Sequence, residues 1–590
     1  MKRLVKIFTI FILSGIIFTL GGCEDFMDVN QSKDNPIDPP IPNRMPLVVF
    51  MASQITYDHA EYGVYLSQCL TTGSKIATNY CYKGVWNFLT MNRHPQWRRH
   101  FYDIGVNGNG LLTSAEKENA RNVILITRTI LLYSTLLTTD AFGDMPHSEV
   151  YKSTTPPYDT QESIYEWMFN EVDELLRLYN DESWTKCPDN VNITPIMDRI
   201  FQGNLAKWNV FTKAIKARML LRKLPNWDNT PTSCDAIIAA VDATLNDPNY
   251  TDIIYKYDGG TTEANCPWGP AQPKLNLGWA QARDNLLDQS LPSKFFLYGM
   301  LGGYTRENTY VATRGHALDP RATKMMNATV GQPMRYLENN IGMAVTERIT
   351  DYPGLFSSNN PFTKNDGYIL LIGKEELLFI KAEAQYWKGD KIGSYATYIE
   401  AVDTNLKRFN AIPADNASAT EQRNYERFRS IRFTGEINYT IAELMQQKYI
   451  AMYLQPEQWT DVRRYNYSSR TNGIRYDRQY VYSIKNCYNG GTTAQPNATH
   501  FTTEFSLTRP FNLLAEHWDT PDSYGINAFF SPNAWVNRIN YDPETEDRYN
   551  RKELERLGAY KNPEWLKKRM IWAYKNNNYV ECSDAGIEWK

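Results

Sequence analysis

The sequence contains few of the residues, and none of the short motifs, that serve catalysis or metal binding. Only 8 cysteines and 7 histidines occur in 590 residues, and they form no C-x-x-C pair, so the sequence does not contain the ligand pattern of a zinc finger. The H-E-x-x-H, G-x-S-x-G and phosphate-loop motifs are also missing. We therefore expect no metal site, no cofactor and no catalytic activity. One alternative stays open, because a pair of carboxylates for glycoside hydrolysis leaves no mark in a sequence.

An excess of positive charge is missing as well. Lys and Arg number 63 against 66 Asp and Glu, which gives a net charge of −3. No basic block occurs along the chain, and this argues against a nucleic-acid partner. The acidic residues Asp542, Glu544, Glu546 and Asp547 lack the spacing of a calcium loop and are expected to be solvated surface. Residues 105–110 (GVNGNG) lack the glycine order of a dinucleotide fingerprint and are expected to form a turn-rich loop.

The first residues resemble a bacterial lipoprotein signal. Three basic residues precede an apolar stretch at residues 7–20, which is followed by two glycines and Cys23. The segment LGGC resembles a lipobox, which implies cleavage before Cys23 and acylation of that residue; an ordinary cleaved signal that leaves a free thiol is the alternative. The acidic residues after Cys23 resemble the surface-export signal of Bacteroidetes lipoproteins. We expect a signal peptide at residues 1–22 and a proline-rich, extended tether at residues 23–46.

Helical periodicity dominates residues 47–224 and 375–455. Two of the expected helices meet at Gly389 within about 34 residues, close to the tetratricopeptide period. The predicted fold class is therefore mostly α: a tetratricopeptide-like helical-repeat scaffold within one domain, residues 47–590. Apolar residues recur at helical spacing in Leu47–Leu70, Glu116–Thr139, Gln161–Tyr179, Arg199–Leu224, Glu375–Lys388, Ser394–Phe409 and Thr440–Leu454.

The regions around residues 73–96, 250–370 and 468–540 have the composition of long loops with short β-strands. Long loops on a rigid scaffold commonly bind ligands. Aromatic residues make up 13% of the chain, and sugars present flat C–H faces to aromatic rings. The candidate ligand-binding residues are the loop aromatics Tyr80, Tyr82, Trp86, Trp268 and Trp279. The alternative for each is that the ring only pins its own loop to the scaffold.

A further cluster lies in the segment QWTDVRRY. Arg463 and Arg464 beside Trp459 offer the kind of donors that bind anions. We expect them instead to hold the last helical repeat together, with Asp461 or another acid as partner.

Several segments, in the same order along the chain, resemble the signatures of SusD/RagB outer-membrane lipoproteins. DAFGDMPHSEVYK resembles the family's YGDxPyseA, and DTQESIY resembles the segment that follows it there. Departures are small: Phe142 replaces the usual Tyr, Tyr467 is not followed by Pro, and Asp542 separates Tyr541 from the next Pro. They affect local turns only. The matching segments lie at residues 140–152, 159–165, 203–224, 319–326, 375–390, 446–467 and 538–550.

This resemblance implies a helical scaffold that carries a loop-rich ligand-binding half and is anchored at the outer membrane, facing the cell surface. It also implies capture of glycans, or of peptides in some members, and delivery to a SusC-like TonB-dependent transporter, without catalysis. Two alternatives remain at this point: a surface scaffold for protein interactions, and a surface glycoside hydrolase. Ligand binding without turnover separates glycan capture from both.

Overall fold

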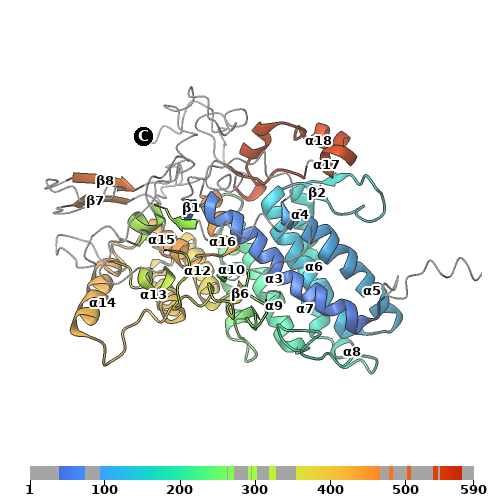
Figure 1. Cartoon of the computed structure of the whole chain (residues 1–590), viewed down its shortest axis with the longest axis horizontal. Coiled ribbons are helices and arrows are strands. Elements are labelled where there is room, and N and C mark those ends of the chain that lie inside the picture. Colours follow the sequence, from blue (N-terminus) through green and yellow to red (C-terminus); the bar gives the residue numbers. More distant parts are fainter. Residues whose placement is uncertain are drawn as a thin grey trace, which may run out of the picture.

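The computed structural model describes residues 39–72, 94–261, 264–270, 290–293, 295–301, 318–326, 354–465, 478–482, 501–505, 536–542 and 545–573. Helices dominate this part of the chain (Figure 1). The N-terminal half contains α3 (Ile41–Leu66), α4 (Pro95–Arg98), the π-helix η1 (Arg99–Val106), α5 (Asn107–Lys117), α6 (Arg121–Phe142), α7 (Gln161–Tyr179), α8 (Glu182–Thr185), α9 (Leu205–Leu221) and α10 (Pro231–Leu245).

The remaining helices lie between Phe295 and Ala573. They are the π-helix η4 (Phe295–Met300), α11 (Ala322–Met325), α12 (Lys374–Lys388), α13 (Lys391–Arg408), α14 (Ala419–Arg432), α15 (Ile441–Ala451), α16 (Pro456–Arg464), α17 (Glu546–Tyr549), α18 (Arg551–Leu557) and the 3₁₀ turns η11 (Pro563–Lys567) and η12 (Ile571–Ala573). This helical architecture confirms the predicted fold class.

Strands in the described residues are short and pair two by two. All four pairs are antiparallel, and each forms a separate two-stranded sheet that is not part of an extended sheet. The pairs are β1 (Leu70–Thr72) with β5 (Ser290–Pro292), β2 (Met145–Pro146) with β3 (Tyr158–Asp159), β4 (Ile253–Lys256) with β6 (Tyr368–Ile372), and β7 (Arg478–Tyr482) with β8 (Phe501–Phe505).

Each of the seven segments with helical periodicity overlaps a helix of the structure. The segment predicted at Gln161–Tyr179 coincides with α7, because Thr160 caps its start by accepting a hydrogen bond from the Ser163 backbone N–H. Helix α6 is long and apolar enough to cross a membrane, but 89% of its most apolar window is buried inside the fold. It is therefore the central core helix of the N-terminal half.

The helix pair α12–α13 has the predicted repeat geometry. Gly389 ends α12 in the left-handed conformation with a φ of 95°. Asp390 then caps α13 by accepting from the Gly393 backbone N–H. Ala384 is fully buried where the helices turn back on each other, so a small side chain permits their close approach.

Two expectations about local structure are wrong. The proline-rich segment was expected to be extended through residue 46, but α3 begins at Ile41 and includes Pro42 and Pro46. A proline in the first turn removes only an N–H that has no helical partner. Residues 105–110, expected to form a turn-rich loop, are instead helical and lie in η1 and α5. Their glycines allow close packing on α6, because a Cβ on Gly108 would lie 3.2 Å from Leu131 Cδ2.

Helices from distant parts of the sequence enclose the core. Figure 1 shows α3 to α9 gathered on one side and α12 to α15 on the other, with the C-terminal α17 and α18 beside β2 of the N-terminal half. Helix α3 packs against α5, α6, η1 and α16, so it joins the first helices to the last repeat.

Candidate functional site

The structure describes only one of the five predicted ligand-binding aromatics. Trp268 is 1% exposed, and its ring meets that of Tyr57 on α3 edge-on, with the ring centroids 4.7 Å apart. This placement favours the alternative role for Trp268, which is to pin its loop to the scaffold. Tyr80, Tyr82, Trp86 and Trp279 lie outside the described residues, as does Cys23.

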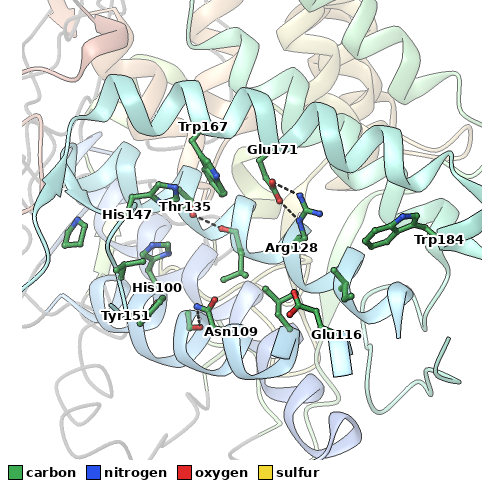
Figure 2. A pocket seen from close by; sticks show the side chains of 16 residues that line it. His100, Asn109, Glu116, Arg128, Thr135, His147, Tyr151, Trp167, Glu171 and Trp184 are labelled. Atoms are coloured by element: carbon green, nitrogen blue, oxygen red, sulfur yellow. Dashed lines mark hydrogen bonds and ion pairs between the residues drawn. The ribbon is translucent and has the colours of Figure 1, made fainter. Parts of the chain in front are cut away.

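A pocket of about 540 Å³ opens between three helices of the N-terminal half (Figure 2). Helix α6 contributes Arg128 and Thr135, seven residues apart and therefore on one face of the helix. Helix α7 contributes Trp167 and Glu171 at a spacing of four. Helix α5 lines the opposite side with polar residues that include Glu116.

An ion pair crosses the pocket from α6 to α7. Arg128 donates from Nε and Nη2 to the two carboxylate oxygens of Glu171, at 2.7 Å each. Their side chains are 24% and 13% exposed. The pair holds the two helices in register and leaves charged groups in contact with the cavity.

Two histidines lie at one end of the pocket, opposite Trp184 (Figure 2). His100 Nδ1 is 2.8 Å from Ser134 Oγ, and burial lowers the pKa of His100 to about 3. The ring of His147 lies edge-on to that of Trp167 with centroids 4.2 Å apart, and burial also lowers the pKa of His147. Both imidazoles are therefore neutral at pH 7.

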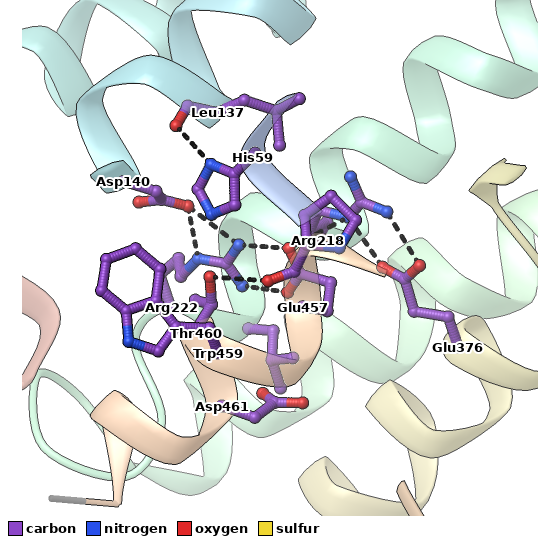
Figure 3. Close-up of polar contacts among 12 residues, drawn as sticks. His59, Leu137, Asp140, Arg218, Arg222, Glu376, Glu457, Trp459, Thr460 and Asp461 are labelled. Carbon is purple, nitrogen blue, oxygen red and sulfur yellow. Dashed lines mark hydrogen bonds and ion pairs between the residues drawn. The ribbon is translucent and has the colours of Figure 1, made fainter. Parts of the chain in front are cut away.

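A second polar cluster is buried between α6, α9, α12 and α16 (Figure 3). Arg222 donates from Nε to Asp140 at 2.9 Å and from both Nη atoms to Glu457 at 2.7 Å. Arg218 forms a similar two-pronged pair with Glu376, at 2.7 and 2.8 Å. We call these five residues the buried ionic cluster.

The charges of Arg222 and Glu457 stabilise each other within the buried ionic cluster. Burial lowers the pKa of Arg222, but attraction to Asp140 and Glu457 outweighs it and raises that pKa well above its usual value. Burial raises the pKa of Glu457, but Arg222 and Arg218 outweigh it and hold that pKa below its usual range. Solvent does not reach these groups, so they hold the fold together and do not bind ligand.

The QWTDVRRY segment has the structural role expected of it. Arg464 donates to Asp461 at 2.7 Å and to Glu383 of α12 at 2.8 Å, with all three side chains almost fully buried. The guanidinium of Arg463 lies 3.4 Å from the centroid of the Trp459 ring and donates to a backbone carbonyl of α6 at 2.7 Å. These arginines tie α16 to α6 and α12.

One of the acidic residues expected at the solvated surface is instead half-buried and hydrogen-bonded. Glu546 accepts hydrogen bonds from the Tyr158 hydroxyl and, at 3.2 Å, from Trp97 Nε1. Burial raises the pKa of Glu546. The expectation failed because spacing along the chain gives no information about β3 and α4, which pack onto this residue.

No cluster of His, Cys, Asp and Glu suited to a metal ion occurs in the part of the chain that the structure describes. Sequence reasoning missed the pocket residues. The available signal was Arg128, the single charged residue within residues 122–139, but this signal does not reveal that Glu171 of another helix faces it.

The chain matches the model of a SusD-like family, described as "Starch-binding associating with outer membrane", over residues 45–477. No curated protein matches it.

Solved structures share the fold over nearly their whole length. A SusD homolog from Parabacteroides distasonis has a TM-score of 0.58 and 18% identity, covering 92% of this chain and 99% of that one. A SusD/RagB family protein from Bacteroides thetaiotaomicron has a TM-score of 0.57 and 14% identity, covering 91% and 99%. A SusD homolog from Flavobacterium johnsoniae, described as chitin-binding, has a TM-score of 0.55 and 13% identity, covering 91% and 98%.

Proposed function

The chain belongs to the SusD-like family of proteins associated with the outer membrane, and on that premise we propose that it captures glycans at the cell surface. In this proposal it passes them to a SusC-like TonB-dependent transporter and does not cleave them. Acylated Cys23 anchors it in the outer membrane, and the proline-rich segment before α3 holds the folded part away from the lipid.

The family match over residues 45–477 is the observation that carries this proposal. It spans the scaffold from α3 to α16, which includes the ionic pairs that close the fold. The family description names starch, and one structure with the same fold is described as chitin-binding. Both ligands are polymers of neutral sugars, so a glycan is favoured over a peptide.

The ligand-binding aromatics proposed for this capture are Tyr80, Tyr82, Trp86 and Trp279. Stacking of sugar rings on aromatic faces suits a receptor that must release its ligand, because apolar contact is not directional and needs few hydrogen bonds. Trp268 is not part of this proposed site, since its ring is buried against Tyr57.

The experiment for capture is calorimetric titration of residues 24–590 with starch, chitin oligosaccharides, other polysaccharides and peptides, with product release followed by chromatography. We expect saturable binding of a glycan without cleavage. Trp86→Ala should weaken binding about tenfold, the loss of about 1.4 kcal/mol that one stacked ring supplies. Tyr549→Ala is the matched control, since Tyr549 is an aromatic residue 61% exposed on α17. Cleavage of the glycan would contradict the proposal, and absence of binding would favour an interaction scaffold.

The experiment for anchoring and partnership uses the full chain in its native membrane. Cys23→Ala should move the protein from the membrane fraction to the soluble fraction, because acyl chains provide the attachment. The acylated protein should co-purify with a TonB-dependent barrel after detergent extraction. Membrane attachment that persists in Cys23→Ala would contradict the anchor, and purification without a barrel would contradict the partnership.

A further inference from the structure

We propose that the pocket between α5, α6 and α7 is a second carbohydrate site, which takes a short neutral oligosaccharide. It lies on the helical scaffold, apart from the loop aromatics of the proposed function. The class of ligand, a carbohydrate, rests on the proposed function. The location of the site and the lack of charge on the ligand are argued from the geometry of the pocket.

The shape of the pocket suits a short linear molecule. Both α5 and α7 pack on α6, so α6 forms the floor of a groove whose walls are the other two helices. Its volume of about 540 Å³ is within the range of roughly 300–1,000 Å³ typical of small-molecule sites. Figure 2 shows His147 at one end and Trp184 at the other, with the Arg128–Glu171 pair between them.

The polar groups of the groove can both donate to and accept from sugar hydroxyls. Arg128 uses Nε and Nη2 for Glu171, and the described residues offer no acceptor to its Nη1, which remains a donor for ligand. Asn109 donates from Nδ2 to the Gly105 carbonyl at 2.8 Å, which leaves its Oδ1 as an acceptor. The Glu116 carboxylate is a further acceptor on the same wall. A hydroxyl group satisfies donors and acceptors together, whereas a purely anionic or cationic group does not.

The electrostatics of the groove favour a ligand without charge. Arg128 is paired with Glu171, and the negative charge of Glu116 is offset by the positive charge of Arg121, whose guanidinium lies 5.4 Å from the centroid of the Trp184 ring that lines the groove. His100 and His147 contribute no positive charge at neutral pH, because burial lowers both of their pKa values.

Two indole rings supply apolar surface along the groove. Trp167 and Trp184 both line it and both remain partly exposed. The guanidinium of Arg121 lies 5.4 Å from the centroid of the Trp184 ring and fixes its orientation. An indole ring that has a fixed orientation and is partly exposed to solvent is suited to contact the C–H face of a sugar.

The test is titration of residues 24–590 with maltotriose, tri-N-acetylchitotriose and, as a non-sugar probe, trialanine. Hydrogen exchange of α5 and α7 is measured with each probe. We expect one of the trisaccharides to slow exchange in both helices. Glu116→Ala and Trp184→Ala should each weaken this binding about tenfold. Glu116 is exposed on α5, so Glu116→Ala tests the site even if Trp184→Ala fails to fold.

The matched controls are Glu118→Ala and Tyr102→Ala, whose exposed side chains do not line the pocket. Both should bind the trisaccharide as the unmodified chain does. Full binding by Glu116→Ala and Trp184→Ala, with loss in Trp86→Ala, would overturn this inference and leave the proposed function intact. Protection of α5 and α7 by trialanine alone would overturn it as well. Absence of binding by every glycan would overturn both proposals.

Discussion

Replacement of Arg222 by Met should destabilise the folded chain strongly. Arg222 is fully buried and donates to Asp140 at 2.9 Å and to Glu457 at 2.7 Å through both Nη atoms. Methionine fills a similar volume but leaves both carboxylates without their main counter-charge. Loss of one partner from a buried ion pair costs about 3–5 kcal/mol. The lower end is expected here, because Glu457 keeps Arg218 at 3.5 Å.

Thermal unfolding followed by circular dichroism measures this loss. The unfolding entropy near 60 °C is about 2.1 cal/mol/K per residue, so about 3 kcal/mol lowers the midpoint of a chain of this length by about 2–3 °C if it unfolds as one unit. Arg177→Met is the matched control. Arg177 forms the same two-pronged pair with Glu174, but the two side chains are 59% and 43% exposed.

The control should leave the midpoint unchanged, because solvent screens an exposed pair. The double variant Arg222→Met/Glu457→Gln should recover part of the loss, since it removes one of the stranded carboxylates. A midpoint for Arg222→Met equal to that of the unmodified chain would refute the pairing described for the buried ionic cluster.

Three further predictions concern single positions. Gly143→Ala should cost about 1–3 kcal/mol in a denaturant titration, because Gly143 has a φ of 85° and a ψ of −120° that other residues rarely adopt; Gly260→Ala, where a Cβ would meet nothing within 4 Å, should cost less. Trp268→Ala should cost about 3–5 kcal/mol by opening a core cavity, and normal stability would show that its ring is not core. Burial raises the pKa of Glu546 above 4.5 in the folded chain. Protonation of Glu546 therefore contributes to the free energy of unfolding, fully below the unfolded-state pKa, and this contribution is lost as the pH rises through the folded-state pKa. The neutral variant Glu546→Gln should therefore gain stability relative to the unmodified chain as the pH rises above 4.5, and unfolding curves that stay parallel across that range would contradict the assignment.

The helices were predictable because their signal is local. Trp208, Ile215 and Met219 follow one helical stripe of α9, and all three are fully buried. Gly389 ends α12 through its own backbone conformation, which needs no information from distant residues. The family signatures also predicted the order of the matching segments along the chain. The family match and the fold comparison agree with that assignment.

The polar clusters were not predictable to the same degree, because their partners are distant in sequence. Arg128 and Glu171 are 43 residues apart, and Arg222 and Glu457 are 235 residues apart. A stripe of apolar residues predicts that a helix face is buried, but not which charge lies opposite an arginine on that face. The same reason explains the error at Glu546, whose partner Trp97 lies 449 residues earlier in the chain.

The separation of Arg222 from Glu457 has a consequence for the order in which the molecule is assembled. While the chain is being made, α9 exists for 235 residues of synthesis before its carboxylate partner on α16 is available. During that interval Arg222 has, among the described residues, only Asp140 of α6 as a carboxylate partner, so the buried ionic cluster stays incomplete until Glu457 is made. The ion pairs that stabilise the finished fold thus also delay the burial of this part of the core. A nascent chain that ends before α16 lacks Glu457 and therefore cannot complete the buried ionic cluster.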